Sequence, residues 1–89
     1  MGKKIYKYDK VLVRKFGEKI AFLRKRANFT QDELAFRVNI SPSYLSAIER
    51  GVTDTTISTA KRLAKAFSIS MSELFNDKIW LYWWKGIIL

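Results

Sequence analysis

Residues 30–51 read TQDELAFRVNISPSYLSAIERG, and their pattern predicts two short helices joined by a tight turn. Thr30 and Glu33 have the spacing of a capping box, in which each side chain accepts a hydrogen bond from the backbone N–H of the other residue. A helix is therefore expected to begin at Thr30. Apolar residues recur at helical spacing as far as Val38, and Asn39 tolerates the left-handed conformation with which many helices end. This helix is expected to stop by Asn39.

A second helix is predicted directly after this turn. Ser41 is a good N-cap, and Pro42 stands in the first turn, where the N–H that proline lacks would have no partner within the helix. Leu45 and Ile48 supply a core-facing stripe, and Gly51 suits the left-handed position that follows a helix. Two helices joined this tightly cross steeply, which leaves the second one free to enter the major groove of DNA.

An amphipathic basic helix is predicted before this pair, with Asp9 as its N-cap. Gly17 is unfavourable inside it, since an interior glycine costs about 1 kcal/mol relative to alanine. The apolar residues at helical spacing are expected to face the core, namely Leu12, Phe16, Ile20, Leu23 and Ala27. The basic residues are expected on the opposite, solvent-facing side, namely Arg14, Lys15, Lys19, Lys25 and Arg26.

Two more helices are predicted after a loop at residues 52–55. Thr56 can cap the first of them, and Ser70 and Glu73 form a second capping box that opens the last and shortest one. The first is expected to bury one apolar face, made of Ile57, Ala60, Leu63, Ala64 and Phe67. The last has three apolar residues, Met71, Leu74 and Phe75. No repeat or linker interrupts these helices, so we predict an all-α, five-helix domain at residues 9–76.

The net charge of +9 over 89 residues is unevenly distributed. Residues 1–26 carry ten of the 17 lysine and arginine residues but only two of the eight acidic residues. Residues 1–8 form a basic N-terminal arm, which is either a solvated tail or an arm that contacts phosphate or a minor groove. A basic field attracts nucleic acids, anionic membranes and acidic proteins alike, so the charge alone does not identify the partner.

The composition leaves little material for catalysis or metal binding. The chain has no cysteine and no histidine, so it lacks disulfides, thiolate sites, the usual general base and the commonest metal ligand. No phosphate-binding loop or nucleophile motif occurs. We therefore expect no enzyme, no cofactor and no metal site. The sequence also lacks the apolar run of a signal peptide or of a bilayer-spanning helix, and we expect a cytoplasmic protein without a membrane partner.

The predicted helix pair resembles the helix-turn-helix domain of the Cro and lambda-repressor family. That family opens its second helix with Thr-Gln, here Thr30 and Gln31, and closes its third with Ser-x-Ile-Glu-x-Gly, here SAIERG at residues 46–51. The Thr-rich loop before Ile57, together with Ser43-Tyr44, resembles the controller proteins of restriction-modification systems more than it resembles phage repressors. The resemblance implies a lambda-repressor-like, five-helix domain that binds double-stranded DNA. Further matches extend it to Leu34-Ala35, residues 63–66 (LAKA) and residues 73–75 (ELF).

The resemblance also implies which residues bind DNA. Gln31 is expected to lie against a phosphate and to support the start of the helix after the turn. The base-reading positions of the family hold small residues here, namely Ser41, Pro42, Ser43 and Ala47. Polar contacts are expected from Tyr44, Ser43, Ser46 and Arg50, with methyl contacts and DNA shape supplying the remainder. In the following loop, hydroxyls such as that of Thr53 can donate hydrogen bonds to a phosphate, although the negative charge of Asp54 would repel it.

Arg24 and Glu49 match the buried ion pair of the family and are expected to have a structural role. Glu49 follows Ile48 in the part of its helix that packs inward. Such a pair adds little net stability, but removal of one member strands the other charge at a cost of about 3 to 5 kcal/mol. Neither residue is therefore expected to contact DNA.

Residues 77–89 depart from the family because they are rich in aromatic side chains. Residues 79–89 read IWLYWWKGIIL, and such a run left in water would promote aggregation. Our preferred interpretation is an extended segment or strand that makes a homodimer, since aromatic residues are enriched in interface centres. The alternatives are packing on its own domain, membrane contact and a cloning artefact. The expected dimer contacts are Phe75, Ile79, Trp80, Leu81, Tyr82, Trp83 and Trp84.

Taken together, these features predict a sequence-specific transcriptional regulator that binds a two-fold symmetric operator as a homodimer. One alternative is an antitoxin-type module that neutralises a protein partner through the aromatic tail and autoregulates through its helix-turn-helix. Another is a membrane-surface protein that uses the basic arm and the Trp-rich end together. Copurification of an acidic polypeptide would favour the first alternative, and flotation with liposomes would favour the second.

Overall fold

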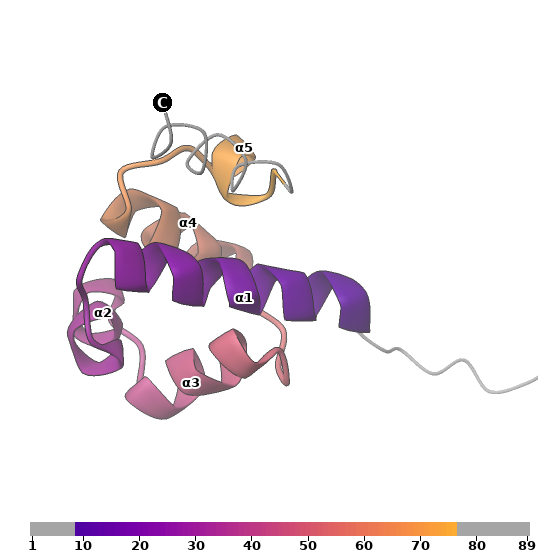
Figure 1. Ribbon diagram of the computed structural model, residues 1–89, viewed down its shortest axis with the longest axis horizontal. Coiled ribbons are helices and arrows are strands. Elements are labelled where there is room, and N and C mark those ends of the chain that lie inside the picture. Colours follow the sequence, from indigo (N-terminus) through magenta and orange to yellow (C-terminus); the bar gives the residue numbers. More distant parts are fainter. Residues whose placement is uncertain (1–8, 77–89) are drawn as a thin grey trace, which may run out of the picture.

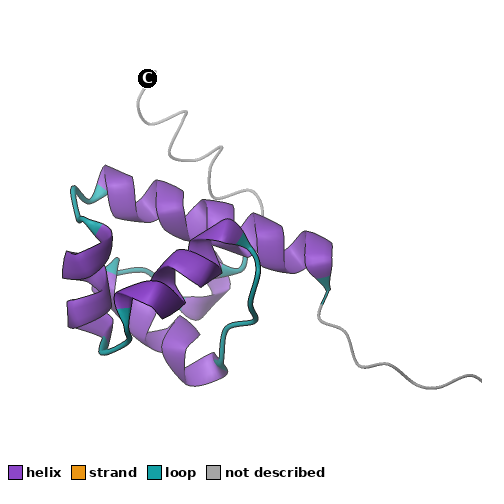
Figure 2. Ribbon diagram, turned by 90° about the horizontal axis from the view of Figure 1, so that it is seen from below, coloured by secondary structure: helices purple, strands orange, loops and turns teal. Residues whose placement is uncertain are grey.

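The computed structural model describes residues 9–76, and within that range every regular element is a helix (Figure 1; Figure 2). This confirms the predicted all-α, five-helix fold. None of the helices in this range is both long and apolar enough to cross a membrane. The predicted basic arm (1–8) and aromatic tail (77–89) lie outside the described residues. In chain order the helices are α1 (Lys10–Arg26), α2 (Gln31–Val38), α3 (Pro42–Arg50), α4 (Ile57–Ala66) and α5 (Met71–Leu74).

Local sequence signals set the ends of the helices. Both predicted capping boxes are complete; in the first, the Glu33 N–H donates to Thr30 Oγ1 over 3.0 Å and the Thr30 N–H donates to Glu33 Oε1 over 2.8 Å. Asn39 (φ 59°) and Gly51 (φ 72°) take the left-handed conformation at the ends of α2 and α3. All five helices begin after the predicted N-caps, Asp9, Thr30, Ser41, Thr56 and Ser70.

The long helix α1 runs through the middle of the domain (Figure 1). Helix α3 packs along one side of it, and α4 and α5 lie on the other side. Helices α2 and α3 cross steeply, as predicted from the short turn between them. The core lies where the helices meet, and its largest fully buried side chains are Ile20, Leu23, Leu34, Val38, Leu45, Ile48, Leu63 and Leu74.

Helices α1 and α3 approach each other backbone to backbone at Gly17. A Cβ atom at this position would stand 2.1 Å from the carbonyl oxygen of Ile48 and 2.9 Å from that of Glu49, both closer than side chains tolerate. Glycine is therefore required inside α1, where its helix propensity alone makes it unfavourable. The contact brings α1 against the C-terminal half of α3.

The buried face of α1 agrees with the predicted one at Phe16, Ile20 and Leu23 but differs from it at the two ends of the helix. Leu12, expected in the core, is 51% exposed, whereas Val13 is buried. The close contact at Gly17 centres the buried stripe there, and Val13 lies four residues earlier on the same face. Ala27, also expected in the core, is exposed because it is the C-cap of α1 and lies beyond the packed turns.

Lys19 was expected on the solvent side of α1, but it is only 3% exposed. Its Nζ donates to the backbone carbonyl of Glu73 over 2.8 Å and also to that of Asn76, at the end of α5. Burying an ammonium group is tolerable when carbonyl oxygens replace its water. Lys19 thereby holds the end of α5 against α1.

Ile57 was expected in the core, but it is 81% exposed. It is the first residue of α4, and at that end of the helix Thr59 and Ala60 supply the buried face. Ala60, Leu63 and Ala64 of the predicted face are buried, and Phe67, the C-cap of α4, is half-buried.

Candidate nucleic-acid interface

Helix α3 turns an apolar side to the core and a polar side to solvent. Leu45 and Ile48 are fully buried. The opposite side faces away from the other described helices, at the lower edge of the domain in Figure 1. An exposed helix of this kind fits the major groove of B-DNA, which is about 12 Å wide. The predicted base-reading residues lie at the start of α3 and on this side: Ser41, Pro42, Ser43 and Arg50 are exposed, and Ser46 and Ala47 are half-buried.

Arg50 lies along the outward side of α3 rather than projecting freely. Its Nε donates to Ser46 Oγ over 3.3 Å, one helical turn earlier. The structure therefore brings together two of the predicted polar residues. A guanidinium group at this place presents its terminal amino groups near the end of α3.

Tyr44 links α3 to the loop that follows it. The ring is half-buried and packs against the core, and the hydroxyl donates to the backbone carbonyl of Asp54 over 3.3 Å. The proton of this hydroxyl is therefore used within the protein, and its oxygen remains as an acceptor. Thr53, a predicted phosphate contact, is half-buried in the same loop.

The predicted ion pair between Arg24 and Glu49 is present and bidentate. Arg24 Nε lies 2.7 Å from Glu49 Oε2, and Nη2 donates to Oε1 over 3.2 Å. The two side chains are 12% and 6% exposed, and Arg24 Nη1 also donates to the Phe29 carbonyl over 2.8 Å. These bonds satisfy both charges and join α1 to α3.

Gln31 belongs to the same network, which corrects one prediction. Its Nε2 donates to Glu49 Oε1 over 2.9 Å, so Gln31 supports the end of α3 and not its start. The reason is that Arg24 draws the Glu49 carboxylate towards the beginning of α2, within reach of Gln31. The first residues of α2 are thereby fixed relative to α3.

Arg62 supports the end of α2 although no local sequence signal predicts this contact. Its Nε donates over 2.7 Å to the carbonyl of Val38, the last residue of α2. Carbonyls at the end of a helix have no partner within that helix, so this bond stabilises α2 next to the turn that orients α3. Gly17 also orients α3, through its close backbone contact with Ile48. For this residue the sequence does carry a signal, because a glycine inside a helix often marks a close packing contact.

The acidic start of α2 affects the charge of the interface. The Thr30 backbone N–H donates to the Glu33 carboxylate, and this bond lowers the pKa of Glu33 below its ordinary value of 4.5. Glu33 is therefore ionised at neutral pH and favourably placed at the positive end of the helix dipole.

Within residues 9–76, no three histidine, cysteine or acidic side chains gather as a metal ion would require.

Only one of the predicted dimer contacts falls within the described residues. Phe75 follows α5, is 50% exposed, and stacks on Phe16 of α1 with a centroid distance of 5.3 Å. Residues 79–84, which contain the others, lie outside the described range.

Comparison with known proteins agrees with this geometry. The sequence model of the helix-turn-helix family matches residues 20–74. The HTH-type transcriptional regulator SlrR of Bacillus subtilis is 34% identical over 67 residues, which are 74% of this chain and 44% of SlrR. This chain thus spans less than half the length of that relative.

Two solved structures are also similar. The restriction-modification controller protein C.AhdI from Aeromonas hydrophila superimposes with a TM-score of 0.67 and 32% identity, over 70% of this chain and 94% of C.AhdI. SinR, a master regulator for biofilm formation solved in complex with DNA, superimposes with a TM-score of 0.64 and 29% identity, over 68% of this chain and 98% of the chain in that structure. The similarity to C.AhdI confirms the predicted resemblance to controller proteins. Since the matched region contains α2, the turn and α3, the chain belongs to the helix-turn-helix family.

Proposed function

We propose that this protein is a sequence-specific, DNA-binding transcriptional regulator that places α3 in the major groove of its operator. The observation that carries the proposal is the outward side of α3, which is polar, solvent-exposed and fixed from behind by the Arg24–Glu49 ion pair. A rigid helix presented in this way loses little conformational entropy on binding. The DNA complex of the similar SinR supports the same use of the domain here.

The exposed residues divide into two roles. Arg50, Ser43 and Ser46 carry the donors that reach base edges or nearby phosphates, and Tyr44 offers an acceptor. Gln31 and Thr53 contact phosphates on either side of α3. Because Ser41, Pro42 and Ala47 are small, they allow close approach, and methyl contacts and DNA shape supply the remaining specificity.

The regulator acts in the cytoplasm as a homodimer on a two-fold symmetric operator. Paired recognition helices enter successive major grooves when half-sites are about 34 Å apart. The dimer contacts are Phe75 and the aromatic segment at residues 79–84. The basic arm at residues 1–8 adds contacts to the DNA backbone.

Salt dependence of binding to a duplex operator tests the proposal. Each lysine or arginine that neutralises a phosphate releases counterions, so the logarithm of the association constant should fall linearly with the logarithm of the salt concentration. Fluorescence anisotropy between about 50 and 200 mM salt should give a slope of several units. Binding that does not respond to salt would contradict the proposal.

A further inference from the structure

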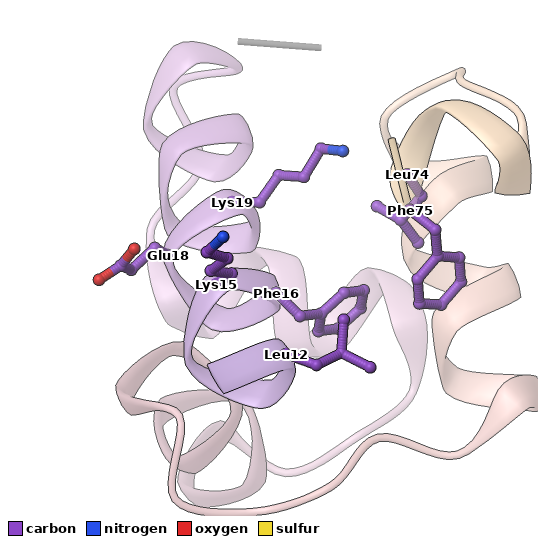
Figure 3. A pocket seen from close by; sticks show the side chains of 7 residues that line it. All are labelled: Leu12, Lys15, Phe16, Glu18, Lys19, Leu74 and Phe75. Atoms are coloured by element: carbon purple, nitrogen blue, oxygen red, sulfur yellow. The ribbon is translucent and has the colours of Figure 1, made fainter. Parts of the chain in front are cut away.

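An apolar groove lies between α1 and α5 (Figure 3). In this view, Leu12 and Phe16 point from α1 towards Leu74 and Phe75, and Glu18 points away. The groove encloses about 230 Å³, and a second hollow of about 60 Å³ continues it past Leu12 towards the loop before α4. A volume of this size is below that of pockets for drug-sized ligands and suits a single large side chain.

Two of the exposed residues that line the groove, Leu12 and Phe75, are large and apolar, and the charged residues Lys15 and Glu18 are exposed beside them. Leu12 is 51% exposed and Phe75 is 50% exposed, and Phe75 rests on the largely buried ring of Phe16. Lys15 at the rim offers a cation that can lie over an aromatic ring. The groove therefore fits an aromatic side chain better than an aliphatic one.

The chain supplies such side chains close by. Phe75 lines the groove and the described residues end at Asn76, whose carbonyl is held by Lys19 of α1. Residues 79–84 (IWLYWW) therefore begin only three residues beyond a fixed point at the groove. Each aromatic side chain in this segment has about 150–250 Å² to bury, far more in total than one groove can cover.

From these observations we infer that the groove binds one aromatic side chain of residues 79–84 from a second copy of this chain, and that the two copies do so reciprocally. A two-fold dimer uses the same surface on both subunits, so each copy provides one groove and one segment. Aromatic residues that do not enter a groove pack against their counterparts across the two-fold axis. This inference rests on the homodimer of the proposed function and names where its interface forms.

The position of the groove is compatible with DNA binding. Helix α5 and α3 lie on opposite sides of α1 (Figure 1). A segment that occupies the groove therefore leaves the outward side of α3 open. The dimer would therefore present both α3 helices to DNA while the groove between α1 and α5 is occupied in each copy.

Leu12→Lys tests the inference, with Val11→Lys as a matched control. Val11 is 54% exposed in the same turn of α1 but does not line the groove or the hollow beside it. Both substitutions add the same charge at an exposed position, so both proteins should fold. In sedimentation equilibrium, Leu12→Lys should raise the dissociation constant of the dimer about tenfold or more, as removal of an interface hot spot does, while Val11→Lys leaves it nearly unchanged.

Tryptophan fluorescence gives a second measurement, because all three tryptophans lie at residues 80, 83 and 84. In the wild type, emission should move to longer wavelength on dilution through the dissociation constant. Leu12→Lys should show the long-wavelength emission at concentrations where Val11→Lys does not. Emission that shifts in Leu12→Lys without any dependence on dilution or change in mass would instead mean that the segment binds its own domain, and would overturn the inference.

Three other outcomes would also overturn it. If Leu12→Lys dimerises as tightly as the wild type, the groove is not the interface, although the homodimer stands. If the wild type is monomeric at every concentration and still binds DNA, the homodimer itself is wrong. If short-wavelength emission appears only after addition of phosphatidylglycerol vesicles, the segment binds lipid.

Discussion

Gly17 of α1 and Ile48 of α3 are in direct backbone contact, so that a Cβ on Gly17 would stand 2.1 Å from the Ile48 carbonyl oxygen. The next residue, Glu49, is the one that pairs with Arg24, which lies about two helical turns after Gly17 on α1. Two contacts from α1 therefore hold the same half of α3. Because both act from the core side, they orient α3 without covering its outward side.

Gly17→Ala should destabilise the protein, contrary to helix propensity. Alanine is favoured over glycine by about 1 kcal/mol in an open helix. Here the added methyl group would push α1 from α3, and forcing extra volume into a packed site costs about 1–3 kcal/mol. Urea unfolding measures the change, and Glu18→Ala at the exposed neighbouring position is the control. A Gly17→Ala protein more stable than the wild type would show that the backbone contact is absent.

Glu49→Gln should lower the free energy of unfolding by about 3 kcal/mol or more, because it leaves the charge of Arg24 buried without a carboxylate. Arg24→Gln should have a similar effect for the opposite reason. The double variant should lose less free energy of unfolding than the two single variants lose together, since the two residues interact directly. Additive losses in a double-mutant cycle would mean that the pair contributes nothing as a pair.

Arg50→Ala should make the salt dependence of DNA binding shallower by about one unit of slope if its guanidinium lies on a phosphate. Lys65→Ala is the control, because Lys65 is exposed on α4, a helix on the other side of α1 from α3 (Figure 1). Both variants remove one positive charge, so a general effect of net charge would change both slopes equally. Equal slopes for the two variants would show that Arg50 does not contact the DNA.

Glu33 should make stability depend on pH in the acid range. The bond from the Thr30 N–H lowers the pKa of Glu33 in the folded state, so its contribution is present above the ordinary value of 4.5 and is lost as pH falls through the lowered pKa. Glu33→Gln keeps an acceptor for the same N–H but cannot ionise. The stability difference between wild type and variant should therefore shrink below pH 4.5. An NMR titration in which the Glu33 carboxyl of the folded protein titrates at or above that value would contradict this account.

Helix ends could be predicted from the sequence because their causes are local. The capping box of Thr30 and Glu33, and the left-handed residues Asn39 and Gly51, each depend on neighbours within four positions. The outward side of α3 was also predictable, since Leu45 and Ile48 define the opposite side by helical periodicity.

Contacts between helices distant in sequence could not be predicted in the same way. Lys19 follows the polar pattern of α1, yet its ammonium group is buried because the end of α5 offers carbonyl oxygens. The bond from Arg62 to Val38 likewise depends on how α4 lies across the end of α2. Leu12 is exposed and Val13 is buried because the contact at Gly17 determines which side of α1 faces α3.

Selection of bound fragments from a pool of random duplex DNA tests the central claim most directly. If paired α3 helices of a dimer enter successive major grooves, the selected sequences should contain a two-fold symmetric motif with half-site centres about 10 base pairs apart. Ser43→Arg should change the sequence of the half-sites and leave their spacing unchanged, because it alters the reading side of α3 and not the dimer. A pool that yields no enriched motif, or one asymmetric motif that is the same for wild type and Ser43→Arg, would contradict the account.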